Sequence, residues 1–593
     1  MSNTLTTSPV ISEGLDDGNS ILSIWVENFG AALATRDNAS LADLFREDGT
    51  FRELLALSWD FRNAVGRDSV VELLVAPETT APLQVGVRAG APTFRDSDDR
   101  GETLATFLQF KTATGAGEGY VELVLGDDHV WEASTVLFSL DSLDAYPEQI
   151  GALRPAGRVH GPVPNRVPWG EQQDSEFEDE DPAVVVIGAG HNGLIVAARL
   201  RALGIPTLVV ESNDRVGDNW RKRYTSLALH TPVVADQLPY LPFPATWTRF
   251  TPKDKLGDFL ESYATLLDLA VWTSSHTENV HHDADAGIWN LDVVRGDGSR
   301  RSLKPRHVVF ATGINGAPNR PDFPGQSDFR GDVMHAVDYK GHAPYVGKRA
   351  VVVGTGVSGH DIAQDLAEHG IDVTMVQRSG TVVLNADTFH KVMHATHTSG
   401  RYTLDQGDLI NAATPFGLLP SFGAAQLAQA RELDHETLDG LTAAGFELSE
   451  GPDGQGVLGL IFGQNATGYY YNAGASDLII DGTITMAHGG VTGFTPSGVT
   501  LDSGETIDAD LVVFATGYQP PTDSVRKVFG DEIADRLGQF ADVADDGEYG
   551  RLWRNCGVDG LWMMIALSIE HGRFYSKHLA LQIAAAEAEA DTN

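Results

Sequence analysis

Cysteine is almost absent from this sequence, because its 593 residues include only Cys556. A single cysteine excludes an intramolecular disulfide, a Cys-x-x-Cys redox pair and a cysteine-rich metal site within one chain. Basic residues are also few, with 42 Lys and Arg against 82 Asp and Glu, and the formal net charge is −40. Such a negative field repels nucleic acid and anionic lipid, so we expect neither as a partner.

Long apolar runs are missing as well. The best run, residues 561–569, is far shorter than the roughly 20 residues that a membrane-spanning helix needs. The first 20 residues offer neither the basic start nor the apolar stretch of a secretion signal. We therefore expect a cytoplasmic protein without a membrane partner.

The chain is long enough, and with 42% hydrophobic residues apolar enough, for about two to four domains. After a flexible tail at residues 1–20, residues 21–150 indicate a small α+β unit, because helix-period apolar positions are followed by strand-like runs. Proline, glycine and nearly unbroken negative charge then predict a solvated linker over residues 151–181.

A run of β-branched residues, VVVIGAG, comes next and predicts a buried parallel strand. Gly188, Gly190 and Gly193 follow in the pattern GxGxxG and lead into a helix. Glycines at these positions permit a tight turn and let a pyrophosphate approach the helix N-terminus. Glu211 ends the following strand, where a carboxylate accepts hydrogen bonds from free ribose hydroxyls and repels a 2′-phosphate. This first site therefore favours FAD or NAD over NADP.

A second turn of the same pattern follows the run RAVVVGTG. It is formed by Gly354, Gly356, Ser358 and Gly359. The position that matches the acidic residue of the first site holds Gln377, and Arg378 and Ser379 come directly after it. A guanidinium makes charge-assisted hydrogen bonds with phosphate, and a neutral glutamine removes the repulsion. The second site is therefore predicted to bind NADPH.

Two different nucleotides in one chain imply electron transfer between them, because a flavin takes a hydride from NADPH and passes electrons on to dioxygen. The expected fold class is α/β, with two Rossmann-like dinucleotide-binding domains preceded by the small α+β unit. We expect an FAD-binding domain in two parts, residues 182–345 and 485–593, with an NADPH-binding domain at residues 346–484 inserted between them.

Further motifs point to one family. Residues 329–339 fit the pattern FxGxxxHxxx(Y/F), residues 217–220 look like a flavin-binding GGxW stretch, and two ATG turns end strand-like runs. From about residue 183 to 583 the chain resembles the class B flavin-containing monooxygenases, including the YUCCA-like enzymes. In that family the ATG turns carry the chain between the two domains. The cofactor-binding residues that the resemblance adds are Asn219, Trp220, Thr312, Gly313, Thr516 and Gly517.

The resemblance implies an enzyme that uses FAD, NADPH and O2 to insert one oxygen atom into a small organic substrate, through a C4a-(hydro)peroxyflavin. Baeyer–Villiger members usually end the fingerprint in tryptophan followed by proline or aspartate, whereas this chain has Tyr339 and Lys340. That departure favours oxygenation at sulfur or nitrogen, or oxidative decarboxylation of a 2-oxo acid. The alternatives are Baeyer–Villiger oxygenation of a ketone, an NADPH oxidase or flavin reductase without oxygen insertion, and a ligand-binding protein with sensory nucleotide sites.

One loop departs from the family in a residue that matters for chemistry. Many members place an asparagine in the pattern LxTNxP beside the oxygen-reacting face of the flavin, and the matching stretch, residues 227–232, has His230 instead. The resemblance implies a flavin-proximal catalytic residue that donates a proton, because histidine titrates near neutral pH. The alternative is a packed loop histidine without a chemical role.

The N-terminal unit resembles the NTF2-like or SnoaL-like α+β cone, through Trp25 and residues 48–68. Asp48, Trp59 and Asp60 are candidates for lining a pocket there. We nevertheless expect a non-catalytic module and a candidate surface for a homodimer.

Three histidines, His390, His394 and His397, stand at helical spacing between Thr and Ser residues. We expect them at the surface and expect no metal site. The surrounding residues 385–462 carry no family motif, and we expect helices or loops there.

Overall fold

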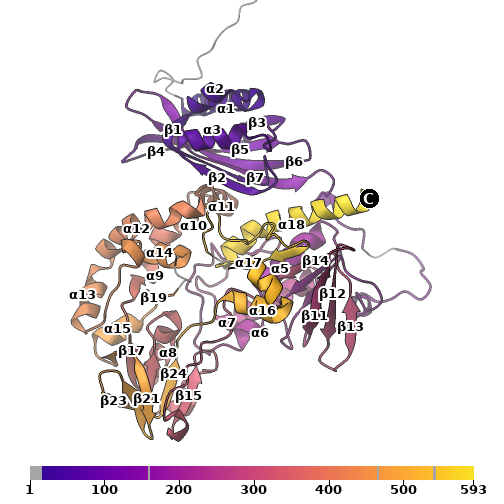
Figure 1. Ribbon diagram of the computed structural model, residues 1–593. Helices are drawn as coiled ribbons and strands as arrows, with labels where there is room; N and C mark the ends of the chain where they lie inside the picture. Colours follow the sequence, from indigo (N-terminus) through magenta and orange to yellow (C-terminus); the bar gives the residue numbers. More distant parts are fainter. Residues whose placement is uncertain (1–16, 158–159, 464–466, 539–541, 593) are drawn as a thin grey trace, which may run out of the picture.

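The computed structural model describes residues 17–157, 160–463, 467–538 and 542–592, and Figure 1 shows how they are arranged. Among these residues, every helix is too short or too polar to cross a bilayer. Residues 1–16 of the expected tail lie outside the described ranges. Because α1 (Gly18–Thr35) already includes residues 18–20, the expected tail extends too far along the chain.

The N-terminal unit is one curved sheet with helices on one side of it (Figure 1). Its strand order is β2-β1-β7-β6-β5-β3, with β4 paired to β5, and all pairs are antiparallel except β1 with β7. The elements are α1, α2 (Asn38–Ala42), β1 (Phe45–Leu54), β2 (Phe61–Val65), α3 (Arg67–Val75), β3 (Gln84–Val87), β4 (Phe94–Asp98), β5 (Gly101–Lys111), β6 (Gly115–Leu125) and β7 (Trp131–Leu143). The α+β character agrees with the prediction, while kinship with the NTF2-like proteins stays a prediction.

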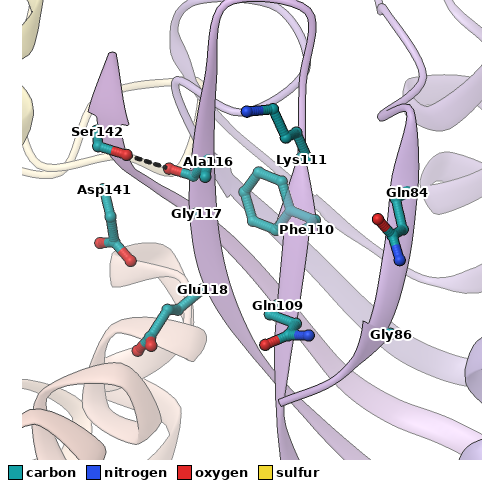
Figure 2. Close-up of a pocket in the computed structure, with 10 residues that line it drawn as sticks. All are labelled: Gln84, Gly86, Gln109, Phe110, Lys111, Ala116, Gly117, Glu118, Asp141 and Ser142. Atoms are coloured by element: carbon teal, nitrogen blue, oxygen red, sulfur yellow. Dashed lines mark hydrogen bonds between the residues drawn. The ribbon is translucent and has the colours of Figure 1, made fainter. Parts of the chain in front are cut away.

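The residues expected to line a pocket in this unit are largely exposed to solvent. Asp48 faces solvent and pairs with Arg46, Trp59 is 40% exposed, and about half of the Asp60 side chain is exposed. A pocket of about 380 Å³ in this unit lies elsewhere, across β3, β5, β6 and β7 (Figure 2). The lining residues that carry polar side chains are Gln84, Gln109, Lys111, Glu118, Asp141 and Ser142. Trp25 belongs to the core instead, with its indole N–H donating to the carbonyl of Leu44 at 3.2 Å.

Residues 151–181 connect this unit to the rest of the chain with little regular structure. They contain only η1 (Gly151–Leu153) and α4 (Trp169–Asp174), and most of their described side chains are exposed. This agrees with a composition that cannot bury a core.

Two parallel five-stranded sheets form the centre of the rest of the molecule, and four of the strands in each follow the same relative order. The fifth, at one edge, is the last strand of the first sheet in the chain but the first strand of the second sheet. The first sheet is β10-β9-β8-β14-β25 and the second is β20-β17-β16-β24-β15. In each sheet the strand that leads into a glycine turn, β8 or β16, is central, and its neighbours on the two sides come from different parts of the chain. That is the switch point where open parallel sheets bind ligands at the carboxyl ends of their strands.

The first sheet consists of β8 (Val184–Ile187), β9 (Thr207–Val210), β10 (Ala270–Trp272), β14 (His307–Phe310) and β25 (Leu561–Met563). Its strands carry nearly unbroken apolar runs because both faces of the sheet are covered. The accompanying elements are α5 (His191–Ala202), α6 (Asp218–Arg221), α7 (Lys253–Leu266), α18 (Ile569–Thr592) and the antiparallel sheet of β11 (His276–Asp283), β12 (Ile288–Val294) and β13 (Arg300–Leu303).

The second sheet consists of β15 (Asp332–His335), β16 (Arg349–Val353), β17 (Asp372–Gln377), β20 (Ile484–His488) and β24 (Leu511–Phe514). It is accompanied by α8 (Val357–Glu368), α15 (Ala475–Ile480), the parallel pair β18 (Val382–Asn385) and β19 (Tyr469–Asn472), and the antiparallel sheet of β21 (Val491–Thr495), β22 (Gly498–Leu501) and β23 (Thr506–Asp508). Short 3-10 turns η2 (Gln326–Asp328) and η3 (Ala343–Tyr345) flank β15.

The boundaries expected at residues 345 and 484 need correction, because the second sheet extends beyond both. Its edge strand β15 precedes residue 346, and its strand β24 follows residue 484. The chain leaves the first sheet after β14 and returns to it only at β25. Hydrophobic patterning could not show this, because β15 and β24 pair with each other across more than 170 residues of sequence.

The segment without motifs is a helical insertion, as expected, and a second helical segment precedes β25 (Figure 1). The insertion contains α9 (Ala386–Met393), α10 (Ala395–Thr398), α11 (Leu404–Ala413), η4 (Phe416–Leu418), α12 (Leu419–Leu433), α13 (His435–Ala443), η5 (Pro452–Gly454) and α14 (Gly456–Gly463). The second segment contains α16 (Pro521–Phe529) and α17 (Asp531–Leu537). Together with the linker and the sheets, these elements complete the described fold.

A buried ion pair joins the N-terminal unit to the rest of the protein. Arg52 on β1 is fully buried and its guanidinium donates to both carboxylate oxygens of Glu548, at 2.9 and 2.6 Å. The same guanidinium donates to the carbonyl of Ala412 on α11 at 2.6 Å and to the hydroxyl of Tyr575 on α18 at 3.0 Å. One continuous apolar core surrounds this contact and extends from the N-terminal sheet into the first parallel sheet.

Replacing Arg52 by alanine is expected to destabilise the protein by about 3–5 kcal/mol, because Glu548 is then buried without a partner. The midpoint of the urea transition, followed by tryptophan fluorescence, measures the change. Arg46→Ala removes a partner of the exposed Asp48 and is the control, with an expected change below about 1 kcal/mol. Equal small shifts in both variants would show that the Arg52 contact does not hold the units together.

Candidate nucleotide-binding sites

The first glycine turn is shaped by backbone contacts that leave no room for side chains. Gly188 has a φ of +107°, and a Cβ there would lie 2.8 Å from the carbonyl oxygen of Ala311. A Cβ on Gly193 would overlap the carbonyl of Gly188. Glycine at both positions lets α5 begin directly against the ends of β8 and β14.

The second glycine turn repeats this geometry. Gly354 has a φ of +112°, and a Cβ there would lie 2.6 Å from the carbonyl oxygen of Ala515. A Cβ on Gly359 would overlap the carbonyl of Gly354, whereas one on Gly356 would meet no atom within 4 Å. The open space at Gly356 lies at the N-terminus of α8, and Ser358 lies in the first turn of that helix. Both turns are therefore cradles of the kind that accept a pyrophosphate.

Polar groups without partners surround the first turn, and this fits a polar ligand. Both ring nitrogens of His191, at the start of α5, are buried and make no hydrogen bond among the described residues. Burial also lowers the pKa of His191 to about 4, so the ring is neutral. The indole N–H of Trp220 is likewise unpartnered, and the Asn219 amide lies beside Gly190, 3.5 Å from where a Cβ would stand. The GGxW-like stretch thus faces the glycine turn.

Glu211 lies where the sequence predicts it, at the end of β9 beside the turn. One carboxylate oxygen accepts a hydrogen bond from the backbone N–H of Ala189 at 2.7 Å, and the other accepts from the backbone N–H of Asn213 at 2.8 Å. The carboxylate is buried and linked to the glycine turn itself. Its place fits a ribose-binding role, which stays a prediction.

At the second site the three residues after β17 differ in exposure. Gln377 is buried, and its amide exchanges two hydrogen bonds of 2.8 Å with the backbone of Glu447. Arg378 and Ser379 are exposed, and in the described part of the chain Arg378 makes no ion pair. Gln377 therefore fixes the end of the strand, while the guanidinium of Arg378 is free to meet a phosphate.

Both ATG turns connect the two parallel sheets, as the sequence predicts. The first, with Thr312 and Gly313, leads from β14 towards β15, and the second, with Thr516 and Gly517, leads from β24 towards β25. The two crossovers pair with each other: the backbone N–H of Asn319 donates to the carbonyl of Gly517 at 3.0 Å. The Thr516 hydroxyl donates to the carbonyl of Asn319 at 2.6 Å. Cofactor contacts of these four residues stay a prediction.

The fingerprint from residue 329 to 339 connects the crossover to the second site. His335 lies 3.1 Å through Nε2 from the carbonyl oxygen of Gly517, and Nδ1 accepts from the backbone N–H of Val337 at 3.2 Å. Burial lowers the pKa of His335, so the ring is neutral and Nε2 carries the donated proton. The buried Tyr339 hydroxyl donates to Asp365 on α8 at 2.6 Å. These contacts give the fingerprint a structural role next to the NADPH-type turn.

His230 contacts the helix of the second site. Its Nε2 lies 3.2 Å from a carboxylate oxygen of Asp361 on α8, and the Tyr224 hydroxyl donates to the same oxygen at 2.6 Å. Burial opposes a charge on the ring, but the hydrogen bond and the negative charge of Asp361 prevail and raise the pKa of His230 above its ordinary 6.5. The His230 carbonyl also accepts from the ring of His390 at 2.8 Å.

Two residues that the sequence did not single out belong to this region. Asp361 is the only described partner of the His230 ring, but a carboxylate inside an ordinary amphipathic helix gives no signal of its own. Arg223 lies two residues after α6, and its Nε is buried without a hydrogen bond among the described residues. An unpaired guanidinium near His335 and Lys340 is suited to an anionic group.

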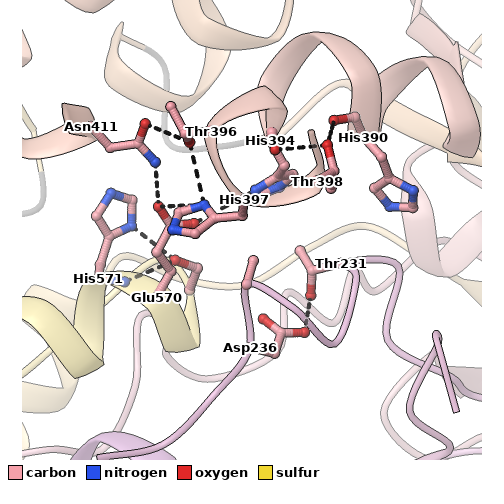
Figure 3. A network of polar contacts seen from close by, with 12 residues as sticks. Thr231, Asp236, His390, His394, Thr396, His397, Thr398, Asn411, Glu570 and His571 are labelled. Atoms are coloured by element: carbon pink, nitrogen blue, oxygen red, sulfur yellow. Dashed lines mark hydrogen bonds and ion pairs between the residues drawn. The ribbon is translucent and has the colours of Figure 1, made fainter. Parts of the chain in front are cut away.

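The expectation that His390, His394 and His397 lie at the surface is wrong. His390 and His397 are buried and His394 is nearly so, with 12% of its side chain exposed (Figure 3). The helix is interrupted at His394, where α9 ends and α10 begins, so the three do not share one helical face. His394 and His397 are covered by the start of α18 and by α11, and His390 by the loop of His230 and Arg249, contacts that no local pattern reveals.

Comparison with known proteins adds three relationships. Residues 185–398 match the family described as pyridine nucleotide-disulphide oxidoreductase. Over 358 residues the chain is 34% identical to indole-3-pyruvate monooxygenase YUCCA1 of Oryza sativa subsp. japonica, covering 59% of this chain and 80% of that protein. Over 212 residues it is 37% identical to the probable indole-3-pyruvate monooxygenase YUCCA3 of Arabidopsis thaliana, covering 35% of this chain and 48% of that protein.

Among solved structures, the chain resembles a cyclohexanone monooxygenase mutant from Rhodococcus sp. Phi1 bound to NADP+, with a TM-score of 0.51 and 15% identity. The match covers 68% of this chain and 86% of that one. At this identity it supports the fold with two dinucleotide-binding domains. The single cysteine excludes the paired thiols named in the matched family, so that match concerns the dinucleotide-binding part.

Replacing the middle glycine of each turn by alanine is expected to weaken the binding of one nucleotide at a time. Gly190→Ala should weaken FAD binding and Gly356→Ala NADPH binding, each at least tenfold, or about 1.4 kcal/mol, because the new methyl meets the ligand while the fold leaves it room. Flavin retention and NADPH titration measure the effects. Gly170→Ala, also in open space, is the control and should change neither. A loss of both nucleotides in each single variant would contradict the assignment.

Replacing Asp361 by asparagine is expected to remove a pH-dependent stabilisation. With a raised pKa, the His230 contribution is fully present below pH 6.5 and is lost as the pH rises through the folded-state value. The stability difference between wild type and Asp361→Asn should therefore be largest below pH 6.5 and shrink above it, leaving a constant part from the lost Tyr224 hydrogen bond. Thermal unfolding from pH 5 to 9 measures it, with the exposed Asp387→Asn as control. A difference that is independent of pH would refute the pairing.

Proposed function

Because this chain belongs to the class B flavin monooxygenases, the family of the YUCCA enzymes, we propose that it uses NADPH and O2 to decarboxylate a 2-oxo acid oxidatively. The enzyme is a flavin-dependent monooxygenase, with FAD and NADPH as its cofactors. The decarboxylation is the finer part of the proposal. Its support is the likeness to two proteins named as indole-3-pyruvate monooxygenases, together with the Tyr339-Lys340 ending of the fingerprint.

One structural observation supports the proposal. Two glycine turns of the same geometry each pack against the start of a crossover between the two parallel sheets. Gly188 abuts Ala311 and Gly354 abuts Ala515, and the two crossovers are hydrogen-bonded to each other. FAD, when bound at the first turn, supplies the two-electron chemistry with NADPH and O2 that no side chain offers. In the proposal, FAD is bound by Gly188, Gly190, Gly193, Glu211, Asn219, Trp220, Thr312 and Gly313. NADPH is bound by Gly354, Gly356, Ser358, Gly359, Arg378, Ser379, Thr516 and Gly517.

His230 is proposed as the residue that holds a proton for the reaction. Its Nε2 faces Asp361, which keeps the ring in place and favours the charged form near neutral pH. The loop that carries His230 is fixed from the other side by the ring of His390, which meets the backbone carbonyl. The chain's contribution is thus orientation, a held proton and exclusion of water, while redox chemistry belongs to the cofactors.

The proposed reaction is balanced as follows. The bond between C1 and C2 of the 2-oxo acid breaks, C1 leaves as CO2, and C2 gains one oxygen atom of O2 and becomes a carboxylate. The second oxygen atom leaves as water, with both electrons taken from NADPH and the remaining proton taken from solvent. One NADPH and one O2 are therefore consumed for each acid and each CO2 formed.

Incubating the FAD-loaded enzyme with ¹⁸O2, NADPH and either indole-3-pyruvate or phenylpyruvate tests the proposal. The expected product is the acid shortened by one carbon with one ¹⁸O in its carboxylate, formed in a 1:1 ratio to CO2 and oxidised NADPH. A sulfide, an amine and a ketone serve as comparison substrates. Peroxide equal to the NADPH consumed would identify an oxidase, and faster turnover to sulfoxide, N-oxide or ester would refute the 2-oxo acid.

Replacing Arg378 by alanine is expected to raise KM for NADPH at least tenfold and to leave KM for NADH nearly unchanged. The reason is that the exposed guanidinium meets only the 2′-phosphate, and a charge-assisted contact of about 1.5–3 kcal/mol is lost. Initial rates with both nucleotides measure the effect. Arg330→Ala, another exposed arginine accompanying the second sheet, is the control. An equal rise of KM for both nucleotides would remove the role of Arg378 in phosphate recognition.

A further inference from the structure

Two imidazoles of the helical insertion and a carboxylate of α18 converge where the insertion meets that helix (Figure 3). His394 lies between α9 and α10, His397 lies in α10, and Glu570 lies in the first turn of α18. One donor atom from each lies within 4.8 Å of the other two. The side chains are nearly withdrawn from solvent, with 12%, 1% and 12% exposed in that order.

The spacing of the three donors suits a metal ion better than hydrogen bonds. His394 Nδ1 lies 3.6 Å from one Glu570 oxygen and His397 Nδ1 lies 3.8 Å from the other. Both distances exceed those of a hydrogen bond. Around a tetrahedral zinc ion with bonds of about 2.0–2.1 Å, neighbouring donors stand roughly 3.3–3.4 Å apart. A shift of a few tenths of an ångström therefore brings each histidine nitrogen to the spacing from Glu570 that coordination needs, and the two histidine donors, within 4.8 Å of each other, must close in as well.

The charge balance also calls for a cation at this place. Glu570 forms no ion pair with lysine or arginine in the described part of the chain, and a buried carboxylate is costly without a positive partner. The nearby guanidinium of Arg573 is fully used, because it donates to both oxygens of Asp408 at 2.8 and 2.6 Å. Nδ1 of His394 is buried and has no hydrogen-bond partner among the described residues.

The surroundings hold two of the donors in the orientation that coordination needs. His397 Nε2 lies 3.0 Å from Asp408, so its proton points to that carboxylate, and Nδ1 is left to face Glu570 at 3.8 Å. The Thr396 hydroxyl lies 3.4 Å from the same Nδ1 but donates its own proton to Asn411 at 2.9 Å, so it makes only a long contact that a bound ion would replace. The Asn411 amide donates to Glu570 at 2.8 Å. A carboxylate behind a ligating histidine and a donor on a ligating carboxylate are the usual outer contacts of zinc sites.

From this arrangement we propose that His394, His397 and Glu570 bind one divalent transition-metal ion of the zinc class. Two histidines and one glutamate leave the fourth position of a tetrahedron open for water or a ligand group. The ion connects the corner between α9 and α10 to the start of α18, and so ties the helical insertion to the first parallel sheet. The inference is independent of the substrate proposed above.

A second group of potential ligands serves as an internal comparison. His342, Asp365 and His369 also lie close together, but Nδ1 of His369 is already 2.7 Å from the backbone carbonyl of Asp365. The His369 ring is 43% exposed, and Asp365 is held by Tyr339. This group is therefore a weaker candidate, and its removal should not affect the first.

The test uses the full-length FAD-loaded enzyme, stripped with a chelator and then titrated with Zn²⁺ in competition with a chromophoric chelator. One tightly bound zinc per chain is expected for the wild type and for His369→Gln and His435→Gln, the latter an exposed histidine on α13. Glu570→Gln, which keeps the shape of the side chain, should bind zinc at least a hundredfold more weakly. Asn411→Ala should weaken binding about tenfold, as loss of an outer contact does.

Cobalt(II) gives a second readout that does not depend on the variants. Co²⁺ added to the stripped wild type should produce the ligand-field absorption of a four-coordinate ion, and Zn²⁺ should displace it. Flavin content and circular dichroism report whether each variant is folded. A wild type that takes up no zinc, or a folded Glu570→Gln variant that binds zinc as tightly as the wild type, would overturn the proposal.

Discussion

Each glycine turn approaches the carbonyl of the neighbouring crossover so closely that no side chain fits between them, and both nucleotide sites depend on this contact. At Gly188 the neighbour is Ala311 and at Gly354 it is Ala515. Ala311 and Ala515 directly precede the two crossovers. The contact that shapes each glycine turn therefore also fixes where the chain leaves one parallel sheet for the other. The relative placement of the two sites thus follows from backbone geometry, and the side chains of the crossovers refine it.

Electrostatic contacts between the units complement this backbone frame. His230 lies in a loop that accompanies the first parallel sheet, and Asp361 lies in α8, which accompanies the second. The pair therefore spans the junction that the two crossovers form. The pKa of His230 therefore depends on the position of the Asp361 carboxylate on α8. Any rotation of α8 away from the loop would expose the carboxylate, lower the pKa of the histidine and weaken its hold on a proton.

Local sequence patterns predicted the strands β8, β16 and β24, both glycine turns and the residues after them, because each of these features depends on a few consecutive residues. The limits of the second unit were placed wrongly because β15 and β24 become neighbours only through the crossovers. His394 and His397 were expected at the surface because the residues that cover them, on α11 and α18, are far away in sequence. The role of Asp361 likewise depends on a contact across 131 positions.

The N-terminal unit contacts the rest of the protein at α11 and α18, the helices that cover His394 and His397. Arg52 donates to the carbonyl of Ala412, which lies one turn after Asp408 on α11. It also donates to the hydroxyl of Tyr575 on α18. Asp408 in turn orients His397 and binds Arg573. The unit therefore contacts α11 and α18, the two helices that lie against His394 and His397. The buried Arg52 guanidinium thus links the N-terminal sheet to α11 and α18 at a single point.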